Sequence, residues 1–242
     1  MKPDLRTPSG DPISHFCFGT MQWGGKADRT ESRAMYDAVR AAGINFFDTA
    51  HGYTGGASET FLGEFAASER DDIFIATKCA STGDCNPEAI AKDIEESLNR
   101  LNIDFVDMLY MHRWSDEVPH EATYEALAKM VEAGRARRIG VSNYAAWQAM
   151  KAECVASVFG LKIEMLQPMY NMVKRQAEVE IFPMCLSEDI AVVPYSPLGG
   201  GLLTGKYNLG QEGRMTHDSM YMSRYGQDWM HTAANDLGEL AS

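Results

Sequence analysis

The sequence predicts an α/β fold built on a parallel β-sheet. Short apolar runs alternate with longer amphipathic runs, and this pair recurs seven times along the 242 residues. Several short runs are almost continuously apolar, as in Phe105–Met111, which is typical of strands covered on both faces. Right-handed crossovers between successive strands suit either an open doubly wound sheet or a (β/α)8 barrel.

The elements follow in a regular order. Residues 7–12 read Thr-Pro-Ser-Gly-Asp-Pro and predict the turn of a small hairpin ahead of the first strand. Strands are expected at Phe16–Met21, Ile44–Asp48, Ile73–Lys78, Phe105–Met111, Ala136–Val141, Ile163–Tyr170 and Ala191–Tyr195. Helices are expected at Thr30–Ala42, Ser58–Ala67, Asn86–Leu101, Pro119–Ala133, Asn143–Val158, Gln176–Glu188 and Gln227–Leu240.

Capping residues support several of these helix ends. Asn86 followed by Pro87 supplies an N-cap and a proline at the first helical position. Gly43 and Gly134 each follow a helix at the position where glycine is favoured. No linker or low-complexity tract interrupts the series, so a single domain over residues 1–242 is expected.

Composition excludes several classes of function. Hydrophobic residues make up 45% and charged residues 23%, as in ordinary globular proteins, and the net charge of -12 offers no basic surface for nucleic acid. The longest uncharged stretch, Ile190–Gly205, is too short and too rich in proline and glycine to cross a membrane. No apolar signal segment begins the chain, so a cytoplasmic protein is expected. The five cysteines lack Cys-x-x-Cys spacing and predict neither a metal site nor a disulfide framework.

Polar side chains follow the predicted strands at one edge of the sheet. Asp48 ends the second strand and Tyr53 follows it, Lys78 ends the third, and His112 follows the fourth. Catalytic groups gather where parallel strands end. Each residue alone has a commoner structural explanation: a turn-capping carboxylate, a packed tyrosine, a surface lysine or a core histidine. All four at the ends of three consecutive strands favour a catalytic site.

The chemistry of these four residues is coherent. Lys78 closes an apolar run and needs a partner, for which Asp48 on the neighbouring strand is the natural candidate. A nearby Lys⁺ favours the phenolate form of tyrosine and lowers its pKa from about 10, which helps proton transfer near neutral pH. Such a site suits protonation of an oxygen while a hydride, as carried by a nicotinamide, reaches the adjacent carbon.

Motifs in the same order resemble those of the aldo-keto reductase family. They are Phe47-Asp48-Thr49-Ala50-xxx-Gly52-Tyr53, Thr77-Lys78, Met111-His112-Arg113, Gly140-Val141-Ser142-Asn143, Gln167-Pro168-xxx-Tyr170-Asn171 and the run Tyr195–Lys206. The resemblance implies a TIM-type (β/α)8 barrel that reduces a small-molecule aldehyde or ketone with NADP(H). It also implies that Tyr53 is the general acid, that Lys78 and Asp48 tune it, and that His112 orients the carbonyl.

The resemblance further implies a set of cofactor and substrate residues. Ser142, Asn143 and Gln167 would bind the nicotinamide carboxamide, and Tyr195 would stack on the ring. Asp48 is also among the cofactor residues. The others are Gly19, Thr20 and Met21 near the ribose, and Ser196, Leu198, Gly199, Gly200 and Lys206 along the pyrophosphate. Tyr53 and His112 would contact the substrate, with Met21, Trp23 and Trp114 as candidate pocket walls.

The sequence departs from the family pattern near its end. Members normally add an eighth strand and a segment that binds the adenosine 2′-phosphate, whereas this sequence ends around the seventh helix. A longer parent protein, a gap closed by a partner and a degraded member would each explain this. The alternative function is therefore a non-catalytic, cofactor-binding regulatory member. A third class, an isomerase or aldolase with Lys78 as a Schiff-base amine, is disfavoured by the adjacent Asp48.

Overall fold

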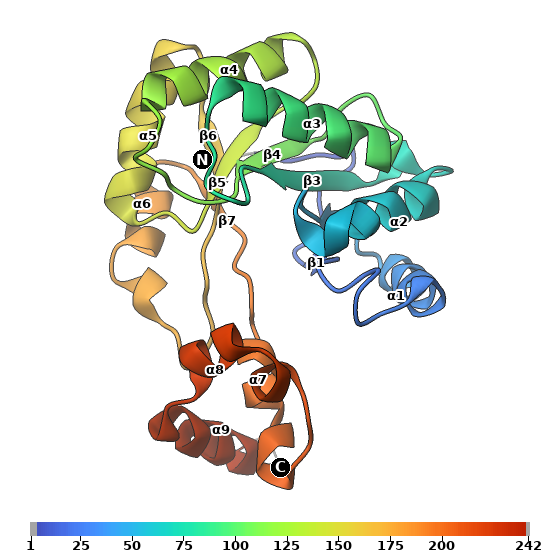
Figure 1. The fold of residues 1–242 in the computed structure, drawn as a ribbon, viewed down its shortest axis with the longest axis vertical. Coiled ribbons are helices and arrows are strands. Elements are labelled where there is room, and N and C mark those ends of the chain that lie inside the picture. Colours follow the sequence, from blue (N-terminus) through green and yellow to red (C-terminus); the bar gives the residue numbers. More distant parts are fainter. Residues whose placement is uncertain (1–3, 241–242) are drawn as a thin grey trace. The chain divides into compact units, whose positions relative to one another are not determined.

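The computed structural model describes residues 4–240, which form two compact units (Figure 1). The first unit comprises residues 4–166 and 185–193, and the second comprises residues 167–184 and 194–240. The prediction of one domain over residues 1–242 stays a prediction.

The first unit is built on a parallel sheet, which confirms the predicted α/β class. Its strands lie side by side in chain order, and residues 4–240 contribute seven of them. They are β1 (Cys17–Gly19), β2 (Phe46–Asp48), β3 (Phe74–Cys79), β4 (Met108–Met111), β5 (Ile139–Ser142), β6 (Ile163–Gln167) and β7 (Ala191–Val192). Neighbouring strands therefore carry their carboxyl ends to the same edge of the sheet.

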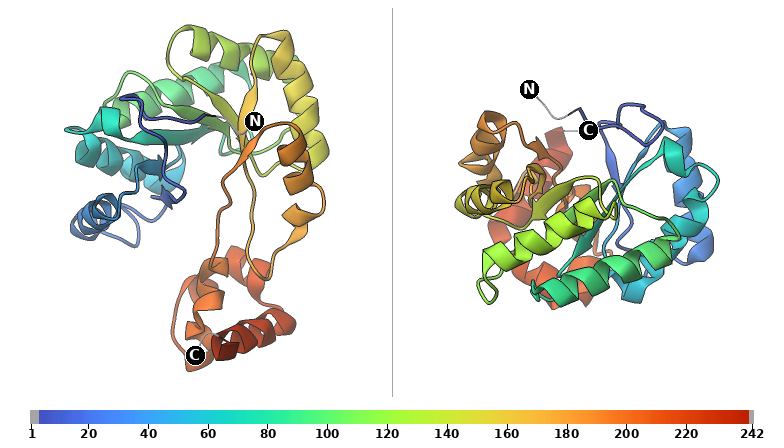
Figure 2. Two further views of the ribbon diagram at one scale, coloured as in Figure 1. Left: turned by 180° about the vertical axis from the view of Figure 1, so that it is seen from behind. Right: turned by 90° about the horizontal axis from the view of Figure 1, so that it is seen from above.

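Helices cover the outer face of this sheet, one after each of the first five strands (Figure 2). They are α1 (Arg29–Ala41), α2 (Ala57–Ala66), α3 (Pro87–Leu101), α4 (His120–Glu132) and α5 (Ala146–Val158). Each packs against the next along the row. Among residues 4–240, no helix combines the length and the apolar character needed to cross a membrane.

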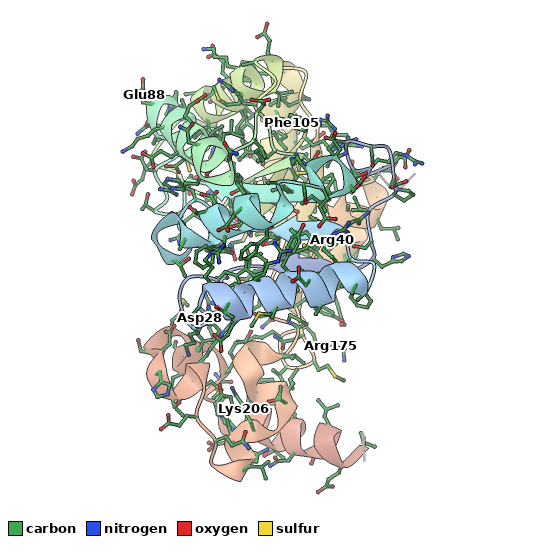
Figure 3. All side chains as sticks on the ribbon, turned by 90° about the vertical axis from the view of Figure 1, so that its right-hand side faces the viewer. Asp28, Arg40, Glu88, Phe105, Arg175 and Lys206 are labelled. Carbon is green, nitrogen blue, oxygen red and sulfur yellow. The ribbon has the colours of Figure 1, made fainter. Side chains whose placement is uncertain are left out.

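Local sequence signals explain the helix ends. Asn86 caps α3 by accepting from the backbone N–H of Ala89, and Pro87 is the first helical residue, as predicted. Helix α1 instead begins before the expected Thr30, because Asp28 and Glu31 form a capping box. Asp28 and Arg40 lie toward opposite ends of this helix (Figure 3).

Three predicted elements have different bounds in the structure, and a proline lies near each of the changed bounds. The expected helix Gln176–Glu188 is a 3₁₀ turn at Gln176–Glu178 followed by α6 (Ile181–Ser187). Pro183 cannot donate within a longer helix, and it fits the first turn of α6, where its missing N–H costs nothing. Strands β6 and β7 end earlier than predicted, at Gln167 and Val192, because Pro168 and Pro194 cannot donate to a ladder.

The core of the first unit lies on the sheet. One cluster of this core has its buried side chains on four strands and the amino-terminal segment, and its members are Leu5, Phe46, Phe74, Ala76, Met108, Tyr110 and Met165. The predicted hairpin at residues 7–12 is confirmed by an antiparallel bridge between Arg6 and Pro12. It brings Leu5 onto this cluster.

The second unit is helical. It contains 3₁₀ turns at Gly199–Thr204 and Lys206–Leu209, and the helices α7 (Arg214–His217), α8 (Ser219–Tyr225) and α9 (Asp228–Leu240). The last helix was predicted from the sequence, whereas α7 and α8 were not. A separate apolar cluster holds these helices together, made of Val173, Leu202, Met215, Tyr221, Tyr225, Met230 and Ala234.

All five cysteines are thiols and lie in the first unit. Cys154 on α5 is exposed, Cys17 is half-buried, and Cys79, Cys85 and Cys185 are buried. Burial raises the pKa of each of the four less accessible thiols, to about 11 for Cys85 and Cys185.

Candidate active site

Three of the four predicted catalytic side chains meet around Lys78. Its Nζ donates to Asp48 Oδ2 at 2.5 Å, to the Thr49 carbonyl at 2.7 Å and to the Tyr53 hydroxyl at 3.3 Å. Parallel pairing explains the meeting, because Asp48 ends β2 opposite Ala76, two residues before Lys78 on β3. The three acceptors match the three N–H donors of the ammonium group.

Lys78 is held as a buried cation. The residue is 1% exposed, and its partner Asp48 is 6% exposed. Burial works to lower the pKa of Lys78, but Asp48 and Tyr53 outweigh it, and the pKa of Lys78 is raised above its usual value. The ammonium also lies 4.9 Å from the centroid of the Tyr53 ring. A fixed positive charge therefore sits beside the phenol oxygen.

His112 completes the predicted group of four. It directly follows β4, and its ring meets the Tyr53 ring edge-on, with centroids 5.8 Å apart and planes at 82°. Burial, Lys78 and Arg113 lower the pKa of His112 to about 3, so the imidazole is neutral near pH 7. Its buried Nδ1 has no hydrogen-bond partner among the described residues. A neutral imidazole beside a phenol can donate one hydrogen bond to a bound oxygen.

Two predicted cofactor residues lie beside His112. Ser142 ends β5 and is buried, and Asn143 follows it in a left-handed backbone conformation with φ 60°. The Asn143 side-chain amide donates to the His112 carbonyl at 2.9 Å and to Ser142 Oγ at 3.2 Å. The strand order thus brings together the two residues that sequence motifs grouped with the catalytic four.

The predicted cofactor residues at the end of β1 contact β2 and α2, and their cofactor role stays a prediction. Gly19 pairs with Asp48 in the sheet, and the next residue, Thr20, is buried and donates to the Asp48 carbonyl at 3.0 Å. Thr20 and Ser58 hydroxyls lie 2.7 Å apart, which joins this loop to α2. Met21 is half-buried.

The two candidate tryptophans of the substrate pocket lie in aromatic clusters. Trp23 is 1% exposed and packs against Phe18, Tyr36 and Phe65, as a core side chain does. Trp114 is half-buried, with ring contacts to His120, Tyr144 and Trp147. Their substrate role stays a prediction.

The remaining predicted cofactor residues lie in the second unit. The backbone of Tyr195 pairs with that of Pro168 and Tyr170, and the following Ser196 has φ 60°. Gly200 has φ 67° and lies against Tyr221, where a Cβ would come within 2.6 Å of the ring. Other members of the set are Gln167, which is buried, Leu198, which is exposed, and Lys206, whose ammonium lies 5.1 Å from the Tyr207 ring centroid.

Sequence reasoning named Asn171 but missed its structural role in the second unit. Asn171 is buried, and its amide donates to the Ser196 carbonyl at 2.9 Å and to the Tyr225 hydroxyl at 3.1 Å. It holds the unusual backbone of Ser196 against the helical core. Asn171 was part of a recognised motif, but no sequence signal pointed to Tyr225 as its partner.

Sequence reasoning also missed Glu59 and Arg100. Glu59 lies on α2 among buried apolar residues and is itself fully buried. An acidic residue on the apolar face of an amphipathic helix was the available signal. Arg100, near the end of α3, is its ion-pair partner at 3.2 Å.

The fold is a parallel α/β sheet with polar side chains gathered where its strands end, and comparison with known proteins identifies the family. Residues 15–242 match the model of the aldo/keto reductase family, so the chain belongs to that family.

Individual relatives are about one-third identical. Norsolorinic acid reductase B of Aspergillus parasiticus is 33% identical over 78% of this chain and 56% of its own length. Aflatoxin B1 aldehyde reductase member 2 of Rattus norvegicus is 32% identical over 96% of this chain and 65% of its own length. A probable voltage-gated potassium channel subunit beta of Arabidopsis thaliana is 34% identical over 84% of this chain and 65% of its own length. The chain thus spans 56–65% of the length of these relatives.

Proposed function

We propose that this protein is an oxidoreductase that reduces an aldehyde or ketone to the alcohol with NADPH. One observation carries the proposal: Lys78 Nζ bonds to both Asp48 and the Tyr53 hydroxyl, while the His112 ring packs against Tyr53. Family membership and the names of the two reductase relatives support it.

Each side chain has a distinct part in the proposed reaction. A nicotinamide cofactor, when bound, supplies the hydride and its electron pair to the carbonyl carbon. Tyr53 gives its hydroxyl proton to the carbonyl oxygen, so the product is an alcohol and the residue left is a phenolate. The Lys78 cation stabilises that phenolate, and Asp48 keeps Lys78 charged. Neutral His112 donates a hydrogen bond that orients the carbonyl oxygen.

The first unit offers groups that fit a nicotinamide carboxamide in their chemistry. Ser142 has a hydroxyl and Asn143 an amide, which together present donors and an acceptor to a group that has both. We propose these two as carboxamide ligands. The cofactor residues of the second unit, and the choice of NADPH over NADH, stay predictions from the family.

Two other functions have less support. A non-catalytic regulatory member would not need the Lys78 contacts with Asp48 and Tyr53, which the structure retains. A Schiff-base mechanism needs an uncharged lysine, whereas the pKa of Lys78 is raised by Asp48 and Tyr53 despite its burial.

A cofactor titration followed by turnover tests the proposal. Tryptophan fluorescence of the purified chain would report NADPH binding, and cofactor absorbance would report its oxidation when para-nitrobenzaldehyde is added. We expect Tyr53→Phe to bind NADPH normally and to lose about 100-fold or more of the turnover rate, because only the proton donor is removed. A Tyr53→Phe variant as active as the wild type would refute the role of Tyr53, and absence of NADPH binding would refute the proposed function.

A further inference from the structure

A carboxylate outside the catalytic group is buried beside it and requires an explanation. Glu59 on α2 is 0% exposed, and an isolated buried carboxylate is costly unless it is paired. Its two oxygens have different partners. Oε1 accepts from the Thr77 hydroxyl at 2.6 Å, and Oε2 lies 3.2 Å from Arg100 Nη1.

The Thr77 contact links this carboxylate to the lysine strand. Thr77 directly precedes Lys78 on β3 and is fully buried, as is the rest of that strand. Successive strand residues point to opposite faces of the sheet. Glu59 therefore holds β3 from the helix side, while Lys78 extends toward Asp48 and Tyr53.

Arg100 holds the turn that carries Tyr53. Its Nη1 donates to the His51 carbonyl at 2.9 Å, two residues before Tyr53. On the other side of the turn, the Arg100 side chain lies against Gly56, where a Cβ would come within 2.6 Å of Nε. Gly56 also has φ 95°, a backbone conformation that favours glycine, and a larger residue there would displace the Arg100 side chain. Arg100 thus contacts the chain on both sides of Tyr53.

Two further contacts fix Arg100 itself. Its Nη2 lies 3.2 Å from Glu96 on the preceding turn of α3, and Glu96 also bonds to the His51 ring at 2.8 Å. Close packing also fixes the position of α3 relative to α2, because a Cβ at Gly63 would lie 2.2 Å from the Leu101 carbonyl oxygen. The guanidinium is therefore held at a defined place rather than extended into water.

We propose that Arg100 and Glu59 form a positioning pair that sets the Tyr53 hydroxyl against Lys78. This inference rests on the proposed function, since it concerns the proton donor of that reaction. Arg100 holds the backbone before Tyr53 through the His51 carbonyl, Glu59 holds the side chain of Thr77 just before Lys78, and their ion pair joins the two. A small displacement of a proton donor lowers the rate of the chemical step more than it lowers cofactor affinity.

The experiment compares Arg100→Met with a matched control, Arg138→Met. Both arginine side chains are about equally exposed, at 27% and 30%, and both are ion-paired in the first unit. Arg138 precedes β5, at the opposite end of that strand from Ser142. We expect Arg100→Met to lower kcat by about tenfold to 100-fold with little change in the NADPH Kd. Arg138→Met should keep the wild-type kcat.

Two results would overturn the proposal. One is a folded Arg100→Met whose kcat stays within about twofold of that of Arg138→Met. The other is a loss that lies entirely in the NADPH Kd. Partial rescue of kcat by Arg100→Lys is expected, because an ammonium can still reach some of the three acceptors, which are the His51 carbonyl, Glu59 and Glu96. If Arg100→Met does not fold, Arg100→Lys and the isosteric Thr77→Val replace it, and wild-type kcat in both would overturn the proposal.

A spectroscopic readout separates this inference from the proposed function. Tyrosine labelled with ¹³C at Cζ gives a signal for Tyr53, assigned by its loss in Tyr53→Phe. We expect Arg100→Met to move or broaden this signal and Arg138→Met to leave it unchanged. If the wild type reduces no carbonyl, the proposed function fails, yet this signal still decides whether Arg100 positions Tyr53. An unmoved signal in Arg100→Met overturns the positioning role.

Discussion

The Lys78 ammonium is tightly held by its neighbours. It is fully enclosed, and its three acceptors are Asp48, the Thr49 carbonyl and Tyr53. Taking both members of an ion pair out of water costs several kcal/mol per ion, and mutual attraction offsets that cost only while both remain. The arrangement therefore serves the charge beside Tyr53 more than it serves stability.

Removal of Asp48 alone should reveal this cost. We expect Asp48→Asn to lower the free energy of unfolding by about 3 kcal/mol, because Lys78 stays buried with its charge uncompensated. The double variant Asp48→Asn/Lys78→Met should regain much of that stability. Urea denaturation of the wild type, both single variants and the double variant measures the coupling. An Asp48→Asn variant as stable as the wild type would show that Lys78 finds another counter-charge.

His112 should make stability depend on pH. Its pKa is lowered to about 3 by burial and by nearby Lys78 and Arg113, whereas an unfolded histidine titrates near 6.5. Between these values the unfolded chain binds the extra proton, so the stabilising contribution is complete above about pH 6.5 and is lost as the pH falls.

A non-titrating side chain at this position should remove that part of the acid sensitivity. Between about pH 7.5 and pH 5.5, the wild type should lose about 1 kcal/mol more stability than His112→Gln does. Urea titrations at both pH values give the comparison, and the other histidines cancel between the two proteins. Parallel losses in the two proteins would show that His112 is solvated in the folded state.

The candidate residues were predictable where a strand end carried them. Asp48, Lys78 and His112 follow apolar runs whose order alone places them at one edge of a parallel sheet. Trp23 shows the limit of that reasoning. The sequence places this tryptophan in the loop after β1, but it does not show that Phe18, Tyr36 and Phe65 pack around it, because that contact joins segments distant in sequence.

Among the elements, α2 and α3 pack so closely that no side chain fits between them at Gly63. Gly63 in the middle of α2 meets the Leu101 carbonyl at the end of α3. Glycine inside a helix costs about 1 kcal/mol relative to alanine, so its presence points to a requirement for space. The same contact keeps Arg100 next to the Tyr53 turn.

Two helical glycines test this requirement. Gly63→Ala should destabilise α2 and α3 by about 2 kcal/mol, because the new methyl group meets backbone that cannot give way. Gly238→Ala in α9 should stabilise its helix by about 1 kcal/mol, since a Cβ there meets nothing within 4 Å. Hydrogen exchange resolved by helix measures both. Slower exchange in α2 of Gly63→Ala would contradict the packing argument.

Helices with strong periodicity were predicted, and the shortest helices were not. Helices α3 and α9 have clear amphipathic patterns, and α3 begins at the predicted proline. Helices α7 and α8, of 4 and 7 residues, are too short to show a period. Their positions depend on burying Tyr221 and Tyr225 in the second cluster, which is a tertiary effect.

For the whole molecule, the order of strands and helices along the chain was enough to predict the fold class. The contacts that position the site residues join distant parts of the sequence and could not be predicted in this way. Arg100 and His51 are 49 positions apart, and no local pattern links them. Each of the two units has its own apolar cluster, as expected of regions able to hold their structure through their own packing.

The distribution of thiols has a practical consequence. All five cysteines lie in the first unit. Unfolding of that unit would therefore expose its buried thiols, whereas unfolding of the second unit would expose no cysteine. A maleimide pulse followed by intact-mass spectrometry should therefore show a single adduct, at Cys154, while the first unit stays folded. Further adducts should appear together when this unit unfolds. The rate of their appearance therefore reports the unfolding rate of the first unit alone. Rapid labelling of Cys79 in the native protein would mean that β3 opens without the rest.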